Sequence, residues 1–248
     1  MLGNPRPSLV FLHGLLGSSR EFVPYLKHFA GHYPSYALDA PMHGDRHAPV
    51  TLTATSIVAD LKEQLRQIPS PYLLVGHSLG GLVALRYAAQ HPEQVVGVVT
   101  LDILPYYTPV FPKQYDFHNA LRHLFSSPQI RADSSRSEAS PYDLSLKKYL
   151  KGHTPEAHEA ILECVGEFVR HELCHLLQPS FLDRPVCFLV GESSSFTEGT
   201  SELWKTDYPQ AQRIVVPRAD HMLHLTKRSE VIEALEVWLA GLCVESLM

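Results

Sequence analysis

The chain has 248 residues, of which 45% are hydrophobic and 19% charged, a composition typical of a globular protein with one large core. Its formal net charge of −5 leaves no basic excess to neutralise phosphates, which argues against a nucleic-acid partner. No window of about 18 apolar residues predicts a transmembrane span, and residues 1–8 lack the basic and apolar regions of a signal peptide. We therefore expect a cytoplasmic protein whose four cysteines are structural thiols.

Short runs rich in Val, Leu and Ile alternate with helical stretches along most of the chain. Continuous apolar runs of this kind are typical of parallel strands that are buried on both faces. Strands are predicted at 9–13, 35–39, 72–77, 95–102, 186–191 and 212–216. Helices are predicted at about 20–30, 54–67, 81–90 and 227–242. The alternation predicts an α/β fold with a mostly parallel sheet of about six strands, flanked by helices.

The most informative motif follows the third of these strands and reads Gly76-His77-Ser78-Leu79-Gly80. A sharp turn from strand to helix forces its apex residue into a strained conformation, and small neighbours let the chain close. The turn exposes the Ser78 hydroxyl to a base and a substrate. The sequence therefore predicts that Ser78 is a nucleophile, the alternative being an ordinary Gly/Ser turn.

Two further motifs stand at the ends of other predicted strands. His13-Gly14-Leu15-Leu16-Gly17 follows the first strand, and Ala219-Asp220-His221 follows the last. The order of oxyanion loop, nucleophile and late histidine is that of an α/β-hydrolase. The chain resembles the α/β-hydrolase superfamily over essentially its whole length.

This resemblance assigns a role to each motif. His221 is predicted to be the general base that takes the Ser78 proton, with the nearby His224 as the main rival. The backbone N–H of Leu79 and, most plausibly, that of Leu15 would form the oxyanion hole.

The acid that orients the histidine is harder to place. The superfamily usually carries an aspartate in the turn after the strand that follows the cap, but residues 191–195 read Gly-Glu-Ser-Ser-Ser. Asp102 ends the preceding strand, and the ends of parallel strands share one edge of a sheet. Small bacterial esterases of the YbfF type resemble this chain in the HGLLGS loop, the GHSLGG turn and a Leu-Asp-Ile strand end. That resemblance implies that Asp102 completes the triad and that Ser195, or a neighbouring serine, joins its network; Glu192 and Asp220 remain alternatives.

The alternation of strand and helix stops between residues 105 and 182, where the pattern is helical. In this superfamily such an insertion is usually a helical cap that walls the substrate pocket. We expect residues 1–104 and 183–248 to form the hydrolase core and residues 105–182 to form the cap.

Two other motifs are interpreted as structural. Residues 39–45 look like the D-x-x-x-H-G turn of the superfamily, in which His43 would shape the floor of the cleft. Residues 171–175 match the H-E-x-x-H signature of zinc proteases, but no third ligand is marked. We interpret them as the polar edge of a helix, and we expect no metal site.

The predicted function is a serine hydrolase that cleaves a small ester or thioester through an acyl-enzyme on Ser78, without metal or organic cofactor. A mild basic excess at residues 113–151 would suit a carrier-linked substrate, although a solvated surface explains it as well. A lyase of the menaquinone-pathway (SHCHC synthase) type is an alternative. Such lyases usually have Tyr before the nucleophile, where this chain has His77. A non-catalytic binding module on the same scaffold is a third possibility.

Overall fold

A computed structural model describes residues 6–46, 50–105, 160, 163–178, 180–194 and 204–245. One parallel sheet of six strands, in the order β2-β1-β3-β4-β5-β6, runs through its centre. The strands are β1 (Ser8–Leu12), β2 (Ser35–Leu38), β3 (Tyr72–His77), β4 (Val95–Leu101), β5 (Val186–Gly191) and β6 (Ala211–Val216). The sequence-based prediction of a six-stranded parallel sheet is confirmed.

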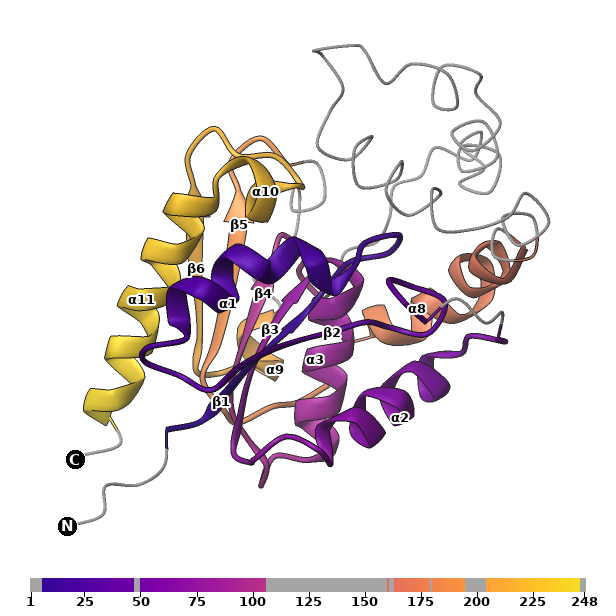
Figure 1. The fold of residues 1–248 in the computed structure, drawn as a ribbon, viewed down its shortest axis with the longest axis horizontal. Helices are drawn as coiled ribbons and strands as arrows, with labels where there is room; N and C mark the ends of the chain where they lie inside the picture. Colours follow the sequence, from indigo (N-terminus) through magenta and orange to yellow (C-terminus); the bar gives the residue numbers. More distant parts are fainter. Residues whose placement is uncertain are drawn as a thin grey trace.

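Helices cover both faces of this sheet (Figure 1). The α-helices are α1 (Val23–Phe29), α2 (Ala54–Leu65), α3 (Leu79–Gln90), α8 (Leu173–Leu177), α9 (Trp204–Asp207), α10 (Leu223–Thr226) and α11 (Arg228–Glu245). A 3-10 turn, η1 (Ser19–Phe22), precedes α1, and a π-helical turn, η2 (Phe168–Glu172), precedes α8. None of the helices among the described residues is long and apolar enough to cross a membrane.

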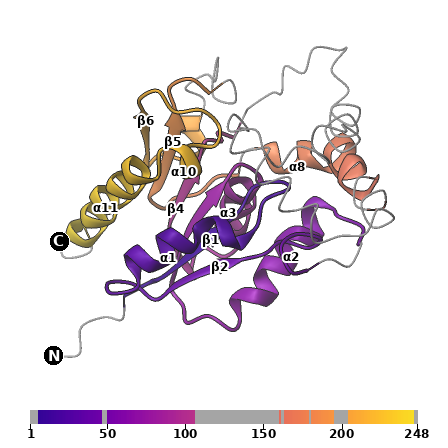
Figure 2. The same ribbon diagram turned by 45° about the horizontal axis from the view of Figure 1, so that its top comes forward.

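Successive strand residues point to opposite faces, and this alternation divides the core in two. Val10, Leu74 and Val98 pack on one face, which α2, α3 and α8 cover. Phe11 and Val75 pack on the other face, beneath α1, α10 and α11. In Figure 2, α8 lies beside α2 and α3, away from α11. Burial on both faces explains why the four inner strands, β1, β3, β4 and β5, read as continuous apolar runs.

The start of α2 shows why the helix begins where it does. Thr53 and Ser56 form a capping box, in which each side chain accepts a hydrogen bond from the other's backbone N–H, at 2.9 and 2.8 Å. Glu172, from the H-E-x-x-H motif, accepts a further hydrogen bond from the Ala54 N–H at 2.9 Å. This carboxylate therefore accepts a hydrogen bond from the first turn of a helix that is 118 residues away in the sequence.

Most of the predicted cap, residues 105–182, lies outside the described residues. The part that is described includes η2 and α8, which pack on the α3 face of the sheet. The Arg86 guanidinium in α3 donates hydrogen bonds to the carbonyls of His175 and Gln178, and so holds the end of α8. The division into core and cap stays a prediction.

Candidate active site

Ser78 occupies the turn between β3 and α3, with φ 49° and ψ −117°. Such a conformation is strained for a residue with a side chain. A Cβ atom on Gly76 would lie 2.3 Å from the backbone of Gly80, and one on Gly80 would lie 2.4 Å from the Leu12 carbonyl oxygen. Both positions therefore require glycine, and the turn has the geometry that the sequence motif predicts.

His221 lies between Ser78 and Asp102, although the three residues come from different strand ends. Its Nε2 is 3.2 Å from Ser78 Oγ, and its Nδ1 is 2.8 Å from Asp102 Oδ2. A carboxylate only accepts hydrogen bonds, so Nδ1–H donates to Asp102 and Nε2 is left to accept the hydroxyl proton. This arrangement can remove a proton from Ser78 and stabilise the imidazolium that forms.

The Asp102 carboxylate is fully buried and receives three hydrogen bonds. Besides His221, the Gly191 N–H donates to Oδ1 at 2.8 Å, and the Ser194 hydroxyl donates to Oδ2. Donors on both oxygens compensate for the removal of the charge from water. Asp102 itself has a φ of 55°, so its side chain leaves the end of β4 in an unusual direction.

The serine that joins this network is Ser194, in the turn that follows β5. Ser195 lies outside the described residues. The turn is tied to the histidine loop by a hydrogen bond from the Ser193 N–H to the Ala219 carbonyl at 2.9 Å. The sequence predicts that a serine of this turn joins the network, but it does not distinguish among three consecutive serines.

The alternative acids and the alternative base are occupied elsewhere. The Glu192 carboxylate accepts a hydrogen bond from the Arg218 N–H at 2.7 Å. Asp220 accepts one from the Met222 N–H, within its own loop, at 2.9 Å. The fully buried His224 imidazole makes its contact with Glu21. In the described part of the chain, none of the three forms a hydrogen bond with Ser78.

The loop after β1 lies directly against Ser78. A Cβ atom on Gly14 would be 2.7 Å from His77 Nδ1 and 3.2 Å from Ser78 Cβ. Within the described ranges, the backbone N–H groups of Leu15 and Leu79 donate no hydrogen bond to the protein. They are thus available to an oxyanion at Ser78.

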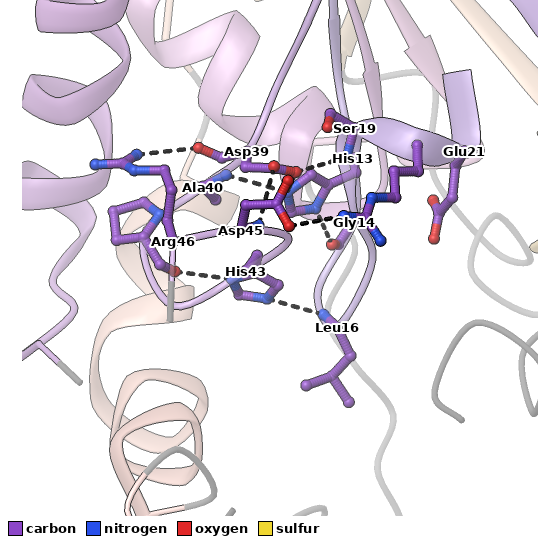
Figure 3. A network of polar contacts seen from close by, with 12 residues as sticks. His13, Gly14, Leu16, Ser19, Glu21, Asp39, Ala40, His43, Asp45 and Arg46 are labelled. Atoms are coloured by element: carbon purple, nitrogen blue, oxygen red, sulfur yellow. Dashed lines mark hydrogen bonds and ion pairs between the residues drawn. The ribbon is translucent and has the colours of Figure 1, made fainter. Parts of the chain in front are cut away.

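A polar network holds this loop in place (Figure 3). The Leu16 N–H donates to His43 Nε2 at 2.9 Å, and His43 Nδ1–H donates to the Pro41 carbonyl at 2.8 Å. His13 donates from Nδ1 to the Gly14 carbonyl at 2.7 Å. Burial, together with the nearby His13, lowers the pKa of His43 to about 3, so His43 is a neutral acceptor.

Asp39 connects the same network to the start of η1. Its carboxylate accepts a hydrogen bond from the Ser19 N–H at 2.6 Å (Figure 3). His13 Nε2 accepts one from the Ala40 N–H at 3.0 Å. The D-x-x-x-H-G turn therefore supports the loop at residues 13–17, as a structural reading of that motif predicts.

The H-E-x-x-H helix contains no assembled metal site. His171 and His175 are exposed, and Glu172 is engaged at the start of α2. No cluster of three or more His, Cys, Asp or Glu side chains suited to a metal occurs among the residues that the structure describes.

Comparison with known proteins agrees with the fold. Residues 9–234 match a family model described as "Alpha/beta hydrolase family". The sn-1-specific diacylglycerol lipase ABHD11 of Mus musculus is 27% identical, over 94% of this chain and 81% of the lipase. The 2-(acetamidomethylene)succinate hydrolase of Mesorhizobium japonicum is 29% identical, over 88% of this chain and 82% of that enzyme. A solved structure titled "Marine microorganism esterase" superposes with a TM-score of 0.70 at 21% identity, covering 95% of this chain and 96% of the esterase. The chain belongs to the alpha/beta hydrolase family.

Proposed function

We propose that this protein is a serine hydrolase that cleaves small carboxylic esters or thioesters through an acyl-enzyme on Ser78. One observation carries the proposal: the His221 imidazole contacts Ser78 Oγ through one nitrogen and the buried Asp102 carboxylate through the other. This is the geometry that nucleophilic catalysis by serine requires.

The first half of the reaction acylates the serine. Ser78 Oγ attacks the carbonyl carbon of the substrate while its proton passes to His221 Nε2. The negative charge on the carbonyl oxygen is stabilised by the N–H groups of Leu79 and Leu15. The carbonyl then re-forms, the bond to the alkoxide or thiolate breaks, and the leaving group takes the proton from His221.

The second half returns the enzyme to its starting state. Water gives a proton to His221 Nε2 and attacks the acyl carbon, and the carboxylic acid leaves as Ser78 Oγ takes the proton back. Asp102 keeps its charge throughout and holds the Nδ1–H of His221, so the imidazole keeps the correct tautomer. No metal or organic cofactor is required by these steps.

The names of the relatives support hydrolysis as the reaction class. One is named a diacylglycerol lipase and another a hydrolase of 2-(acetamidomethylene)succinate. Their substrates differ, so the acyl group and leaving group here are to be found by assay. We also propose that residues 105–182 form the cap that selects the substrate, and that the protein works in the cytoplasm.

Turnover of a chain-length series of nitrophenyl esters and acyl-CoA thioesters tests the proposal. Wild-type protein is expected to hydrolyse part of the series and to be labelled by a fluorophosphonate, and Ser78→Ala is expected to lose both activities. Wild-type protein that is labelled by no phosphonate and cleaves no ester or thioester would contradict the proposal. The next assay would then be elimination from a succinyl-type substrate, because a lyase would catalyse this reaction and a non-catalytic binding module would not.

A further inference from the structure

Two buried imidazoles stack behind the base. The rings of His77 and His224 have centroids 3.9 Å apart and an interplanar angle of 34°. At one end, His224 Nε2 lies 3.1 Å from the Glu21 carboxylate. At the other, His77 Nε2–H donates to the backbone carbonyl of His221 at 2.8 Å. We call this set, Glu21, His224, His77 and the His221 carbonyl, the imidazole stack.

His224 is held firmly within the stack. Its side chain is fully buried, and its backbone carbonyl accepts a hydrogen bond from the Tyr25 hydroxyl at 2.8 Å. The Phe22 ring stacks against it with centroids 5.6 Å apart. Its Nδ1 is a buried atom without a hydrogen-bond partner among the described residues. Since Glu21 accepts from Nε2–H, a proton on Nδ1 would become an unsatisfied buried donor, which is costly. The geometry therefore favours the neutral Nε2–H tautomer.

The stack connects the three segments that carry the proposed chemistry. Glu21 lies in η1, and a Cβ atom on Gly17 would be 3.0 Å from both of its carboxylate oxygens, so the carboxylate sits against the oxyanion loop. His77 immediately precedes Ser78. The last member is the backbone of His221 itself.

We propose that Glu21, His224 and His77 are positioning residues, which set the distance between the His221 imidazole and Ser78 Oγ by holding the His221 carbonyl. The inference rests on the proposed function. His221 lies in a loop after β6 and its side chain is 21% exposed, so packing alone does not immobilise it. The distance from Nε2 to Oγ is already 3.2 Å. A further displacement of about 1 Å can cost roughly 100-fold in rate.

The same residues set the charge around the base. Charged or titratable groups from four elements and the His221 loop face His224: Glu21, Tyr25, His77, His221 and Arg228. Burial lowers the pKa of His224, although Glu21 opposes that shift, and burial also lowers the pKa of His77. Both imidazoles are thus neutral near pH 7, and the positive charge of the reaction forms on His221 alone.

The kinetic test compares two truncations with a conservative variant. Glu21→Ala and His224→Leu are each expected to lower kcat and the rate of Ser78 phosphonylation about 100-fold, with little change in KM. His224→Gln can still donate to Glu21 and should recover part of the loss. Unfolding in urea shows whether each variant is folded. Glu21→Leu, which fills the space of the carboxylate but accepts no hydrogen bond from His224, replaces Glu21→Ala or His224→Leu if either does not fold, with the same expected loss.

The chain offers a matched control in its other His–Glu pair. His28 and Glu236 are 2.7 Å apart, but their side chains are 40% and 52% exposed, unlike the buried His224 and Glu21 pair. His28→Leu and Glu236→Ala are expected to keep wild-type kcat. Wild-type kcat in folded Glu21→Ala and His224→Leu, or a rise in KM alone, would overturn the inference while leaving the proposed function intact.

Nitrogen-15 NMR of the histidine side chains tests the stack without relying on turnover. Neutral imidazoles with the proton on Nε2 are expected for His77 and His224 near pH 7. A protonated His224, or a proton on Nδ1, would refute the stack. Failure of the proposed function would give a different result: Ser78→Ala would keep full activity.

Discussion

Replacing Asp102 by Asn tests the candidate acid more sharply than any other change. The carboxylate accepts from His221 Nδ1–H and Ser194 on one oxygen, and from the Gly191 N–H on the other. An amide offers only one oxygen. If that oxygen keeps the Gly191 bond, the amide NH₂ faces His221 Nδ1, which must then lose its proton to accept. The proton moves to Nε2, and the imidazole can no longer take one from Ser78.

The opposite orientation of the amide is no better. The oxygen would accept from His221, but the NH₂ group would face the Gly191 N–H, and two donors would meet in a fully buried site. The wrong tautomer is therefore the favoured outcome. It lowers kcat by roughly 10⁴-fold in serine enzymes of this geometry, equivalent to about 5 kcal/mol in activation free energy.

The assay is steady-state hydrolysis of the nitrophenyl ester that the wild-type protein cleaves fastest. It compares wild type, Asp102→Asn and Glu192→Gln, and unfolding in urea shows whether each protein is folded. Glu192→Gln is the control, since a Gln oxygen can still accept from the Arg218 N–H. It should stay near wild type. Should folded Asp102→Asn keep more than roughly a tenth of wild-type kcat, or should Glu192→Gln lose activity instead, the assignment of the acid is wrong.

Three further predictions concern the scaffold. Gly76→Ala places a Cβ atom 2.3 Å from the Gly80 backbone and should destabilise the fold by about 1–3 kcal/mol or more in urea; an unchanged midpoint would contradict the close approach. His43 has a pKa of about 3 when folded, against 6.5 ordinarily, so the unfolded chain binds the extra proton between these values. The free energy of unfolding should therefore fall as pH drops through that window, by up to about 1.4 kcal/mol per pH unit from this group, and the slope should be shallower in His43→Gln. Burial raises the pKa of the Cys187 thiol to about 12, so iodoacetamide should label exposed Cys174 in the native protein and reach Cys187 only after unfolding.

Local pattern predicted most of the elements, with errors at their boundaries. The strand predicted at 72–77 has the bounds of β3, because the apolar run from Tyr72 to Val75 leads into a glycine-rich turn. The helix after it was expected from residue 81 but begins at Leu79, since the strained serine passes directly into the first helical turn. The single helix expected at 20–30 is divided into η1 and α1, with Pro24 in the first turn of α1.

No pattern in the sequence predicts the imidazole stack. Proximity in the sequence makes His224 a rival to His221 as the base, whereas its hydrogen-bond partner Glu21 is 203 residues away. With fifteen histidines in the chain, no pattern indicated that two would stack with centroids 3.9 Å apart. Ring stacking and burial depend on the packing of α1, β3 and α10, which periodicity does not report.

The sequence by itself determined the class of fold and the sharp turn at Ser78. Both follow from short-range rules: apolar runs buried on two faces make parallel strands, and glycines on either side of Ser78 allow a turn that other residues would block. Only the tertiary structure decided which carboxylate meets the His221 imidazole. Asp102 and His221 are 119 residues apart; one directly follows β4 and the other lies in the loop after β6, with β5 between these strands. Their contact depends on strand order and on the positive φ of Asp102, and both arise from packing across the whole sheet.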